Sequence, residues 1–192
     1  PESRIFYDLG IIKAEGNITS GDAHLAVNYE TVMKMGLKYY EGKTKAAVKK
    51  LDLTTMEDMN KYHFYNAVLI VIKAVRDFAG RYAALAEKDA ETADKKRQKE
   101  LLTIAEILRR VPYEPARNMR EAVQSMWLIH LVLQIESNGH SLSYGRMDQY
   151  LYPYYKHDID KGIITQDSAC ELLTNLWLKT FTINKVRRSE ER

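Results

Sequence analysis

The sequence holds 192 residues, of which 45% are hydrophobic and 29% charged, and it contains 9 Gly and 4 Pro. This composition excludes disordered, collagen-like and glycine-rich β proteins, and the length suits one domain with a sizeable core. The 29 basic and 26 acidic residues leave a formal net charge of +3, with both signs mixed along the chain, so the charge favours no nucleic-acid partner.

A single cysteine, Cys170, limits the redox and metal chemistry of the chain. One thiol excludes an internal disulfide and any metal site built from several thiolates, and it suits the reducing cytoplasm. We expect Cys170 to pack as a small hydrophobic residue within a helix. The most apolar stretches, 67–72 and 126–135, fall short of the roughly 20 residues that a membrane-spanning helix needs, so no membrane partner is expected.

Apolar residues recur at three- and four-residue steps over most of the chain, and no long run alternates polar with apolar residues. This pattern predicts a mainly α-helical chain. We predict helices, or the apolar stripes of helices, at residues 27–40, 43–51, 54–87, 101–108, 116–135, 147–156 and 165–182. The charged segment 87–100 predicts a solvated turn, so the helices on either side should form a hairpin. Segment 141–145 is predicted to be irregular, with room for one extended strand.

Single residues predict where the helices begin and end. Gly42 is expected to stop the first helix, and Thr54 to cap the long helix through a capping box with Glu57. Thr165 is expected to cap the last helix.

The apolar spacing also predicts which helix faces are buried. In the first helix these residues are Val27, Thr31 or Val32, Met35 and Tyr39. In the long helix they are Phe64, Val68, Val71, Val75 and Tyr82. His63 and His130 lie within apolar stretches and are expected to be hydrogen-bonded core histidines.

The densest group of polar residues spans 134–141, in the order Gln-Ile-Glu-Ser-Asn-Gly-His-Ser. A helix would deliver Glu136, His140 and Ser141 to one of its ends. Glu136 and His140 on one rim can share a proton and hydrogen-bond a hydroxylated substrate, which is general acid-base catalysis in its simplest form. The alternative is an ordinary helix C-terminus, with the Asn-Gly pair at 138–139 as the stop signal and Glu136 in solvent.

Two further polar pairs are candidates for a site. Asp22 and His24 lie on a predicted turn before a helix, where they could contact a ligand, but no third ligand stands at zinc-like spacing, so no metal is expected. Arg146 and Asp148 are too close in sequence to face one another across a helix, and we expect each to have its own structural partner.

Residues 134–150, QIESNGHSLSYGRMDQY, closely resemble glycyl radical enzymes of the pyruvate formate-lyase superfamily. They are most similar to its glycerol and trans-4-hydroxyproline dehydratase branch. The resemblance covers nearly the whole chain, and further matching stretches follow in the expected order at residues 21–24, 28–30, 110–112, 124–127, 176–179 and 183–187.

The resemblance implies a radical lyase. In this family a glycyl radical oxidises a cysteine to a thiyl radical, which removes a hydrogen atom from the substrate before water or another fragment leaves. The implied fold is a ten-stranded α/β barrel wrapped by helices, to which this chain contributes mainly helices and a few short strands. The family's thiyl and radical motifs do not occur in the sequence, so we interpret residues 1–192 as a single N-terminal or middle segment of that domain, with no catalytic residue.

The resemblance also implies partners. The full-length enzyme would be a cytoplasmic homodimer that acts on a small molecule in anaerobic metabolism. A radical S-adenosylmethionine activase would install its glycyl radical. The segment itself is expected to contact the remainder of the barrel and to bind no cofactor, metal, nucleic acid or membrane.

Family likeness assigns substrate contacts to five residues. His24 matches the substrate-facing histidine of the dehydratases, and His140 with Ser141 matches polar contacts to a substrate hydroxyl. Glu136, about one helical turn before His140, becomes a second pocket carboxyl. Asp22 lies beside a position that meets the substrate cation in choline-cleaving relatives. The rival interpretation is a non-catalytic helical scaffold or interaction domain that keeps the family pattern, and a helical nucleic-acid binder ranks last.

Overall fold

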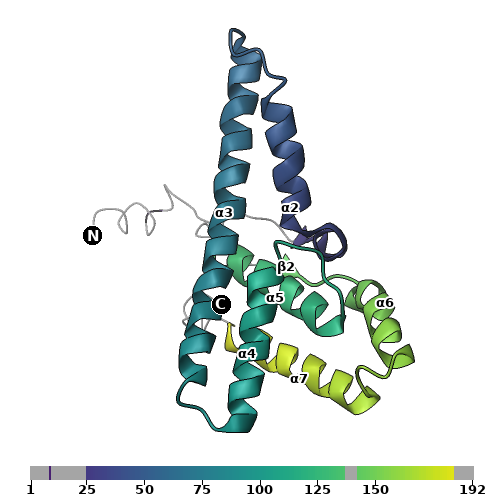
Figure 1. Ribbon diagram of the computed structural model, residues 1–192. Helices are drawn as coiled ribbons and strands as arrows, with labels where there is room; N and C mark the ends of the chain where they lie inside the picture. The colour runs from purple at the N-terminus through teal and green to yellow at the C-terminus, as the bar shows by residue number, and fades with distance from the viewer. Residues whose placement is uncertain (1–8, 10–24, 137–141, 184–192) are drawn as a thin grey trace.

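The computed structural model describes residue 9, residues 25–136 and residues 142–183. These residues form six helices and two short strands, which confirms the prediction of a mainly helical chain with few strands. In chain order the elements are β1 (Leu25–Ala26), α2 (Tyr29–Val48), α3 (Met56–Ala90), α4 (Lys95–Arg110), α5 (Met119–Glu136), β2 (Leu142–Ser143), α6 (Met147–Asp160) and α7 (Gln166–Thr182). Figure 1 shows α2 and the first half of α3 as a hairpin that projects from a body built by the other helices.

Helix α2 changes direction at Gly36, and the predicted stop at Gly42 is wrong. Gly36 has a left-handed backbone with φ of +69°, and a Cβ atom there would lie 2.4 Å from the carbonyl oxygen of Tyr113. Only glycine fits this position without strain. The break lets the next two backbone N–H groups donate to the carbonyl oxygens of residues 112 and 113, each over 2.9 Å. The two helices predicted at 27–40 and 43–51 are therefore one kinked element.

The predicted buried face of the first helix is wrong in part, although Val27 packs against the core as expected. Met35 and Tyr39 are 39% and 38% exposed, whereas Tyr29 and Met33 are fully buried. Tyr29 and Met33 lie one turn apart and pack into the core formed with α5, α6 and α7. Apolar residues recur at helical spacing on both faces of this helix, so the pattern alone could not show which face is buried, and the prediction chose the exposed one.

The long helix α3 begins one residue later than predicted. Thr55 is its N-cap and accepts a hydrogen bond from the backbone N–H of Asp58 over 3.2 Å. Thr54 instead donates its hydroxyl to Asp52 over 2.7 Å, so the predicted capping box with Glu57 is wrong. Two neighbouring threonines offer the same cap chemistry, and the turn at Asp52 decides between them.

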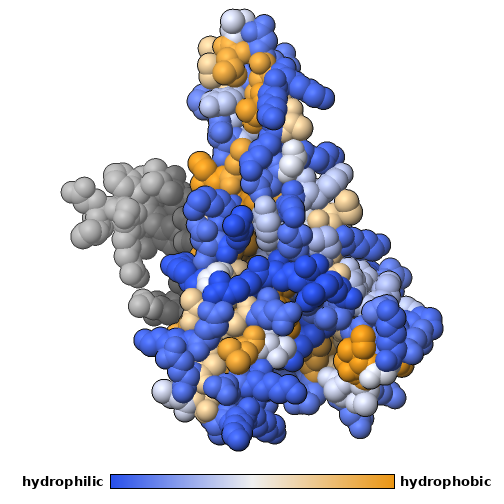
Figure 2. Space-filling model, in the orientation of Figure 1, coloured by the Kyte–Doolittle hydropathy of each residue, from blue (hydrophilic) through white to orange (hydrophobic). Residues whose placement is uncertain are grey.

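Only part of the predicted stripe on α3 is buried. Val75 is buried as expected, but Phe64, Val71 and Tyr82 are exposed. The residues that α3 buries are Ile72, Val75, Ala79, Ala83, Ala86 and Ala90. His63 is exposed, so the prediction of a core histidine there is wrong. Figure 2 shows apolar surface on the projecting hairpin, where α3 has one neighbouring helix.

The predicted hairpin of α3 and α4 is confirmed. Alanines of α3 pack against Leu101, Ala105 and Leu108 of α4, and Leu128 of α5 closes this cluster. The small alanine side chains let the two helices approach closely. Arg109 of α4 pairs with Glu87 of α3 through two hydrogen bonds of 2.8 and 2.5 Å.

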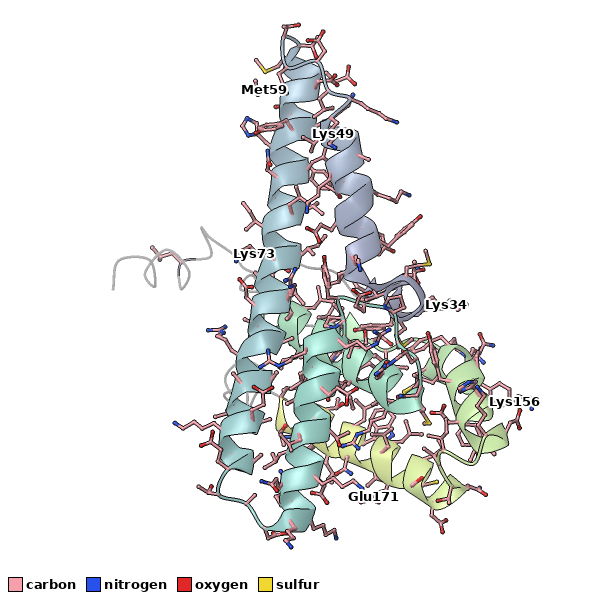
Figure 3. The ribbon with its side chains drawn as sticks, viewed as in Figure 1. Lys34, Lys49, Met59, Lys73, Lys156 and Glu171 are labelled. Atoms are coloured by element: carbon pink, nitrogen blue, oxygen red, sulfur yellow. The ribbon has the colours of Figure 1, made fainter. Side chains whose placement is uncertain are left out.

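The second core joins α5, α6 and α7 to the start of α2. Its buried side chains include Met126, Tyr150, Leu151, Ala169 and Leu176. The predicted cap of α7 is confirmed, since the threonine at 165 and the serine at 168 exchange hydrogen bonds as a capping box. Many charged residues lie on the outside, as Figure 3 shows for Lys73, Lys156 and Glu171.

Two buried carboxylates hold the start of α5. Glu121 accepts hydrogen bonds from the backbone and side chain of Arg117 and from Arg110. Burial alone would raise the pKa of Glu121, but the bonds from Arg117 outweigh it and hold the pKa below its usual range. Asp158 of α6 accepts from the backbone N–H of Met119 over 2.8 Å. No helix of the described part of the chain is long and apolar enough to cross a membrane.

Candidate functional site

The strands β1 and β2 form a short parallel pair beside the C-terminal end of α5. Leu25 pairs with Leu142, and Ala26 pairs with Ser143. In the sequence Leu25 directly follows His24, and Leu142 directly follows Ser141. The pair therefore joins two parts of the chain that lie more than 100 residues apart, each next to a candidate site residue.

Four of the five candidate residues, Asp22, His24, His140 and Ser141, lie outside the described residues. The fifth, Glu136, is the last residue of α5 and is exposed. Its carboxylate is therefore open to a ligand or to solvent at the helix end. This exposure fits both interpretations of the polar cluster that the sequence left open.

Three buried aromatic rings meet beneath the strand pair. Tyr29 begins α2 three residues after β1, His130 lies in α5, and Tyr144 directly follows β2. The hydroxyl of Tyr29 and Nδ1 of His130 are 2.8 Å apart. The rings of His130 and Tyr144 stack with centroids 4.2 Å apart and an interplanar angle of 30°. We call these three residues the ring cluster.

His130 is 2% exposed, as the sequence predicted for a hydrogen-bonded core histidine. Burial lowers the pKa of His130 to about 4, so the ring is neutral at pH 7. Its second nitrogen, Nε2, lies 3.2 Å from the side-chain nitrogen of Gln134, one turn further along α5. A neutral imidazole has one N–H and one lone pair, so it can hydrogen-bond Tyr29 and Gln134 at the same time.

Further hydrogen bonds fix Tyr144 from two other helices. Tyr150 of α6 donates its hydroxyl to the carbonyl oxygen of Tyr144 over 2.6 Å. The Tyr144 hydroxyl and the Thr180 hydroxyl of α7 are 2.8 Å apart. Burial raises the pKa values of Tyr29, Tyr144 and Tyr150, so all three phenols stay protonated near neutral pH. The residue after β2 is thus held by α5, α6 and α7 together.

Sequence reasoning did not single out Tyr29 or Tyr144. Both belong to stretches that carried the family resemblance, but their partners lie 101 residues away for Tyr29 and 36 for Tyr144. No helical spacing can indicate a contact over such distances. The sequence contains one indication of this cluster: His130 lies in an apolar stretch, which predicted a buried histidine that needs a hydrogen-bond partner.

An apolar cavity of about 420 Å³ lies between α6, α7 and the start of α5. Its walls include Met119, Met147, Leu151, Leu173 and Trp177. Cys170 also lines it and is exposed, so the prediction of a core cysteine is wrong. The helix α7 buries the faces of Ala169 and Leu176, which turns the cysteine beside Ala169 outward.

Arg146 and Asp148 face each other, contrary to the prediction that they have separate partners. Nε and Nη2 of Arg146 lie 3.1 and 3.0 Å from the two carboxylate oxygens of Asp148. Both side chains are largely exposed at the start of α6. Arg146 is the residue before the first turn of α6, so its side chain can reach forward to Asp148. Within the described ranges no three His, Cys, Asp or Glu side chains form a group that could hold a metal ion.

Comparisons of the sequence and of the fold with known proteins point to the same family. The family model described as pyruvate formate lyase-like matches residues 1–192. The probable dehydratase YbiW of Escherichia coli is 44% identical over 180 residues, which are 93% of this chain and 22% of that protein.

Two solved structures resemble the described fold closely. A structure from work on 1,2-propanediol dehydration in Roseburia inulinivorans matches with a TM-score of 0.84 and 42% identity over 88% of this chain and 20% of that one. The glycerol-bound glycerol dehydratase of Clostridium butyricum matches with a TM-score of 0.81 and 38% identity, over 88% of this chain and 21% of that one. The chain therefore spans about a fifth of the length of the relatives that it matches.

Proposed function

The chain belongs to the pyruvate formate lyase-like family, and from this premise we propose that it is a segment of a glycyl radical lyase for a small hydroxylated substrate. The relatives support this proposal by their names, which include a probable dehydratase, a glycerol dehydratase and an isethionate sulfite-lyase. In this proposal the segment supplies pocket wall and scaffold. The thiyl cysteine and the radical glycine belong to parts of the enzyme outside the 192 residues.

The observation that carries the proposal is the register of the strand pair. Leu25 lies opposite Leu142, and in the sequence these two residues directly follow His24 and Ser141. Because consecutive Cα atoms are about 3.8 Å apart, this register supports our proposal that His24 and Ser141 contact one common substrate. Glu136 is exposed at the end of α5, six residues before β2 begins.

The proposed chemistry divides between the two parts of the enzyme. The glycyl radical of the complete enzyme would generate the cysteine thiyl radical, which would supply hydrogen abstraction from the substrate. In our proposal His140 and Ser141 hydrogen-bond a substrate hydroxyl, and Glu136 acts with His140 to deliver the proton that the leaving hydroxyl needs. General acid catalysis of this kind is worth about 10²–10⁴-fold in rate. His24 and Asp22 orient the substrate from the β1 side.

The same proposal names the partners of the complete enzyme. A radical S-adenosylmethionine activase installs the glycyl radical, and the enzyme works as a cytoplasmic homodimer. The segment contacts the remainder of the barrel. The competing proposal is a non-catalytic scaffold that keeps the family's helices, which the exposed Glu136 would also allow.

One experiment separates the two. The complete protein is incubated anaerobically with the activase and S-adenosylmethionine, and the glycyl radical is measured by electron paramagnetic resonance. Glycerol, 1,2-propanediol, trans-4-hydroxyproline and isethionate are then offered as substrates. A radical signal with turnover of one of them supports the lyase, whereas no radical and no turnover support the scaffold. The 192-residue chain alone serves as the negative control and should give neither.

A further inference from the structure

The ring cluster connects to α5 the chain segments that follow the two strands. Tyr29 comes directly after the Asn28 cap of α2, close behind β1, and Tyr144 comes directly after β2. Both rings contact His130, which is the shared neighbour of the two chain segments. A movement of either segment relative to α5 would therefore strain a contact to His130.

The burial of the ring cluster leaves its side chains few other hydrogen-bond partners or arrangements. Tyr29 is 1% exposed and His130 is 2% exposed, so water cannot replace a lost hydrogen bond easily. Met33 and Met126, which are also fully buried, fill the space beside the rings in the same core. Close packing of this kind favours one arrangement of the rings over a continuous range of arrangements.

From this geometry we propose that Tyr29, His130 and Tyr144 are positioning residues, which set the spacing between β1 and β2 and so hold the substrate-facing ends of both segments in place. This inference rests on the proposed function for its catalytic consequence. Its structural content, the dependence of the strand pair on His130, can be measured without turnover. All three side chains are buried, and in this proposal they act through the strands.

Substitutions can remove the hydrogen bond between His130 and Tyr29 alone, or both hydrogen bonds of His130 together. Tyr29→Phe deletes the hydroxyl that faces Nδ1 and keeps the ring. His130→Phe keeps a ring for stacking on Tyr144 but loses both hydrogen bonds. His130→Asn places an amide near the position of Nδ1, so it can restore the bond to Tyr29.

Tyr113→Phe is a matched control. The Tyr113 hydroxyl donates to Glu41 over 2.6 Å, between α2 and the loop after α4. The control therefore loses a tyrosine hydroxyl and one hydrogen bond, as Tyr29→Phe does, but away from the strands. Any general cost of removing a tyrosine hydroxyl should be common to both variants.

The test uses the complete protein and two measurements. Hydrogen exchange followed by mass spectrometry reports the protection of backbone amides in residues 25–28 and 142–145. We expect Tyr29→Phe and His130→Phe to raise exchange there about tenfold or more, His130→Asn to restore part of the protection, and Tyr113→Phe to leave it within about twofold of the wild type. The kcat/KM should fall about 10- to 100-fold in the first two variants at equal glycyl radical content.

The outcomes separate the two proposals. If both tyrosine variants exchange and turn over alike, the ring cluster has no positioning role and the inference is overturned. If the wild type lacks lyase activity while exchange at the strands depends on His130 as expected, the proposed function fails and the positioning of the strands stands. Should His130→Phe not fold, Tyr29→Phe and His130→Asn still give the comparison with Tyr113→Phe.

Discussion

Replacing Gly36 by alanine should destabilise the protein strongly. Gly36 has φ of +69°, a region that costs an L-residue about 1–2 kcal/mol. The new Cβ would lie 2.4 Å from the carbonyl oxygen of Tyr113 and 2.7 Å from the carbonyl carbon of Glu114, so the backbone of α2 and the loop must separate. That separation threatens the two hydrogen bonds between them, each worth about 1 kcal/mol. We expect a total loss of about 2–4 kcal/mol in the free energy of unfolding.

Gly42→Ala is the control for this prediction. Gly42 lies six residues further along the same helix, and a Cβ atom added there would have no other atom within 4 Å. Alanine in a helix interior is favoured over glycine by about 0.5–1 kcal/mol, so this variant should be slightly more stable. Urea-induced unfolding followed by circular dichroism compares the two variants with the wild type. Equal unfolding midpoints for Gly36→Ala and the wild type would refute the reasoning from the kink.

Three further predictions concern the buried polar groups and the proposed site. Because burial lowers the pKa of His130 from about 6.5 in the unfolded chain to about 4, the unfolded state binds a proton first as the pH falls. The stabilisation that the neutral His130 gives the folded state, at most about 3 kcal/mol, should be complete above pH 6.5 and should decline as the pH falls toward 4. Unfolding free energies measured over a pH series should show this decline in the wild type. The decline should be smaller in His130→Asn. Glu121→Gln should cost about 1–3 kcal/mol, since a buried carboxylate loses charge-assisted bonds, whereas the exposed Glu106→Gln should cost less than about 0.5 kcal/mol; chemical unfolding that ranks them equally would contradict this. In the complete enzyme, His140→Ala and Glu136→Gln should lower turnover by about 10²–10⁴-fold with little change in melting temperature. Near-normal turnover with a lowered melting temperature would instead assign His140 to a helix cap.

The sequence predicted the helical class and most helix positions, because apolar periodicity records burial on one side of a helix. The prediction from sequence failed where two nearby residues could equally well end or cap a helix. Gly36 and Gly42 are both possible breaks, and only the approach of the loop at Tyr113 selects Gly36. Thr54 and Thr55 are both possible caps, and the hydrogen bond to Asp52 occupies Thr54.

The candidate site shows a similar division. A buried, hydrogen-bonded His130 followed from its apolar neighbours in the sequence, whereas its partner Tyr29 lies 101 residues away. His63 also has apolar neighbours but faces outward, because α3 extends into the projecting hairpin where one side has no neighbouring helix. Local pattern can predict that a face is apolar, but the tertiary arrangement decides whether that face is covered.

We propose that the end of α5 faces a substrate from one side while the segment before β1 faces it from the other. A crystal structure of the complete protein with a hydroxylated substrate bound tests this most directly. We expect a substrate hydroxyl to lie within about 2.6–3.2 Å of His140 or Ser141, with His24 and Glu136 lining the same pocket from opposite sides. A substrate bound elsewhere, with Glu136 and His140 in solvent at an ordinary helix end, would contradict it.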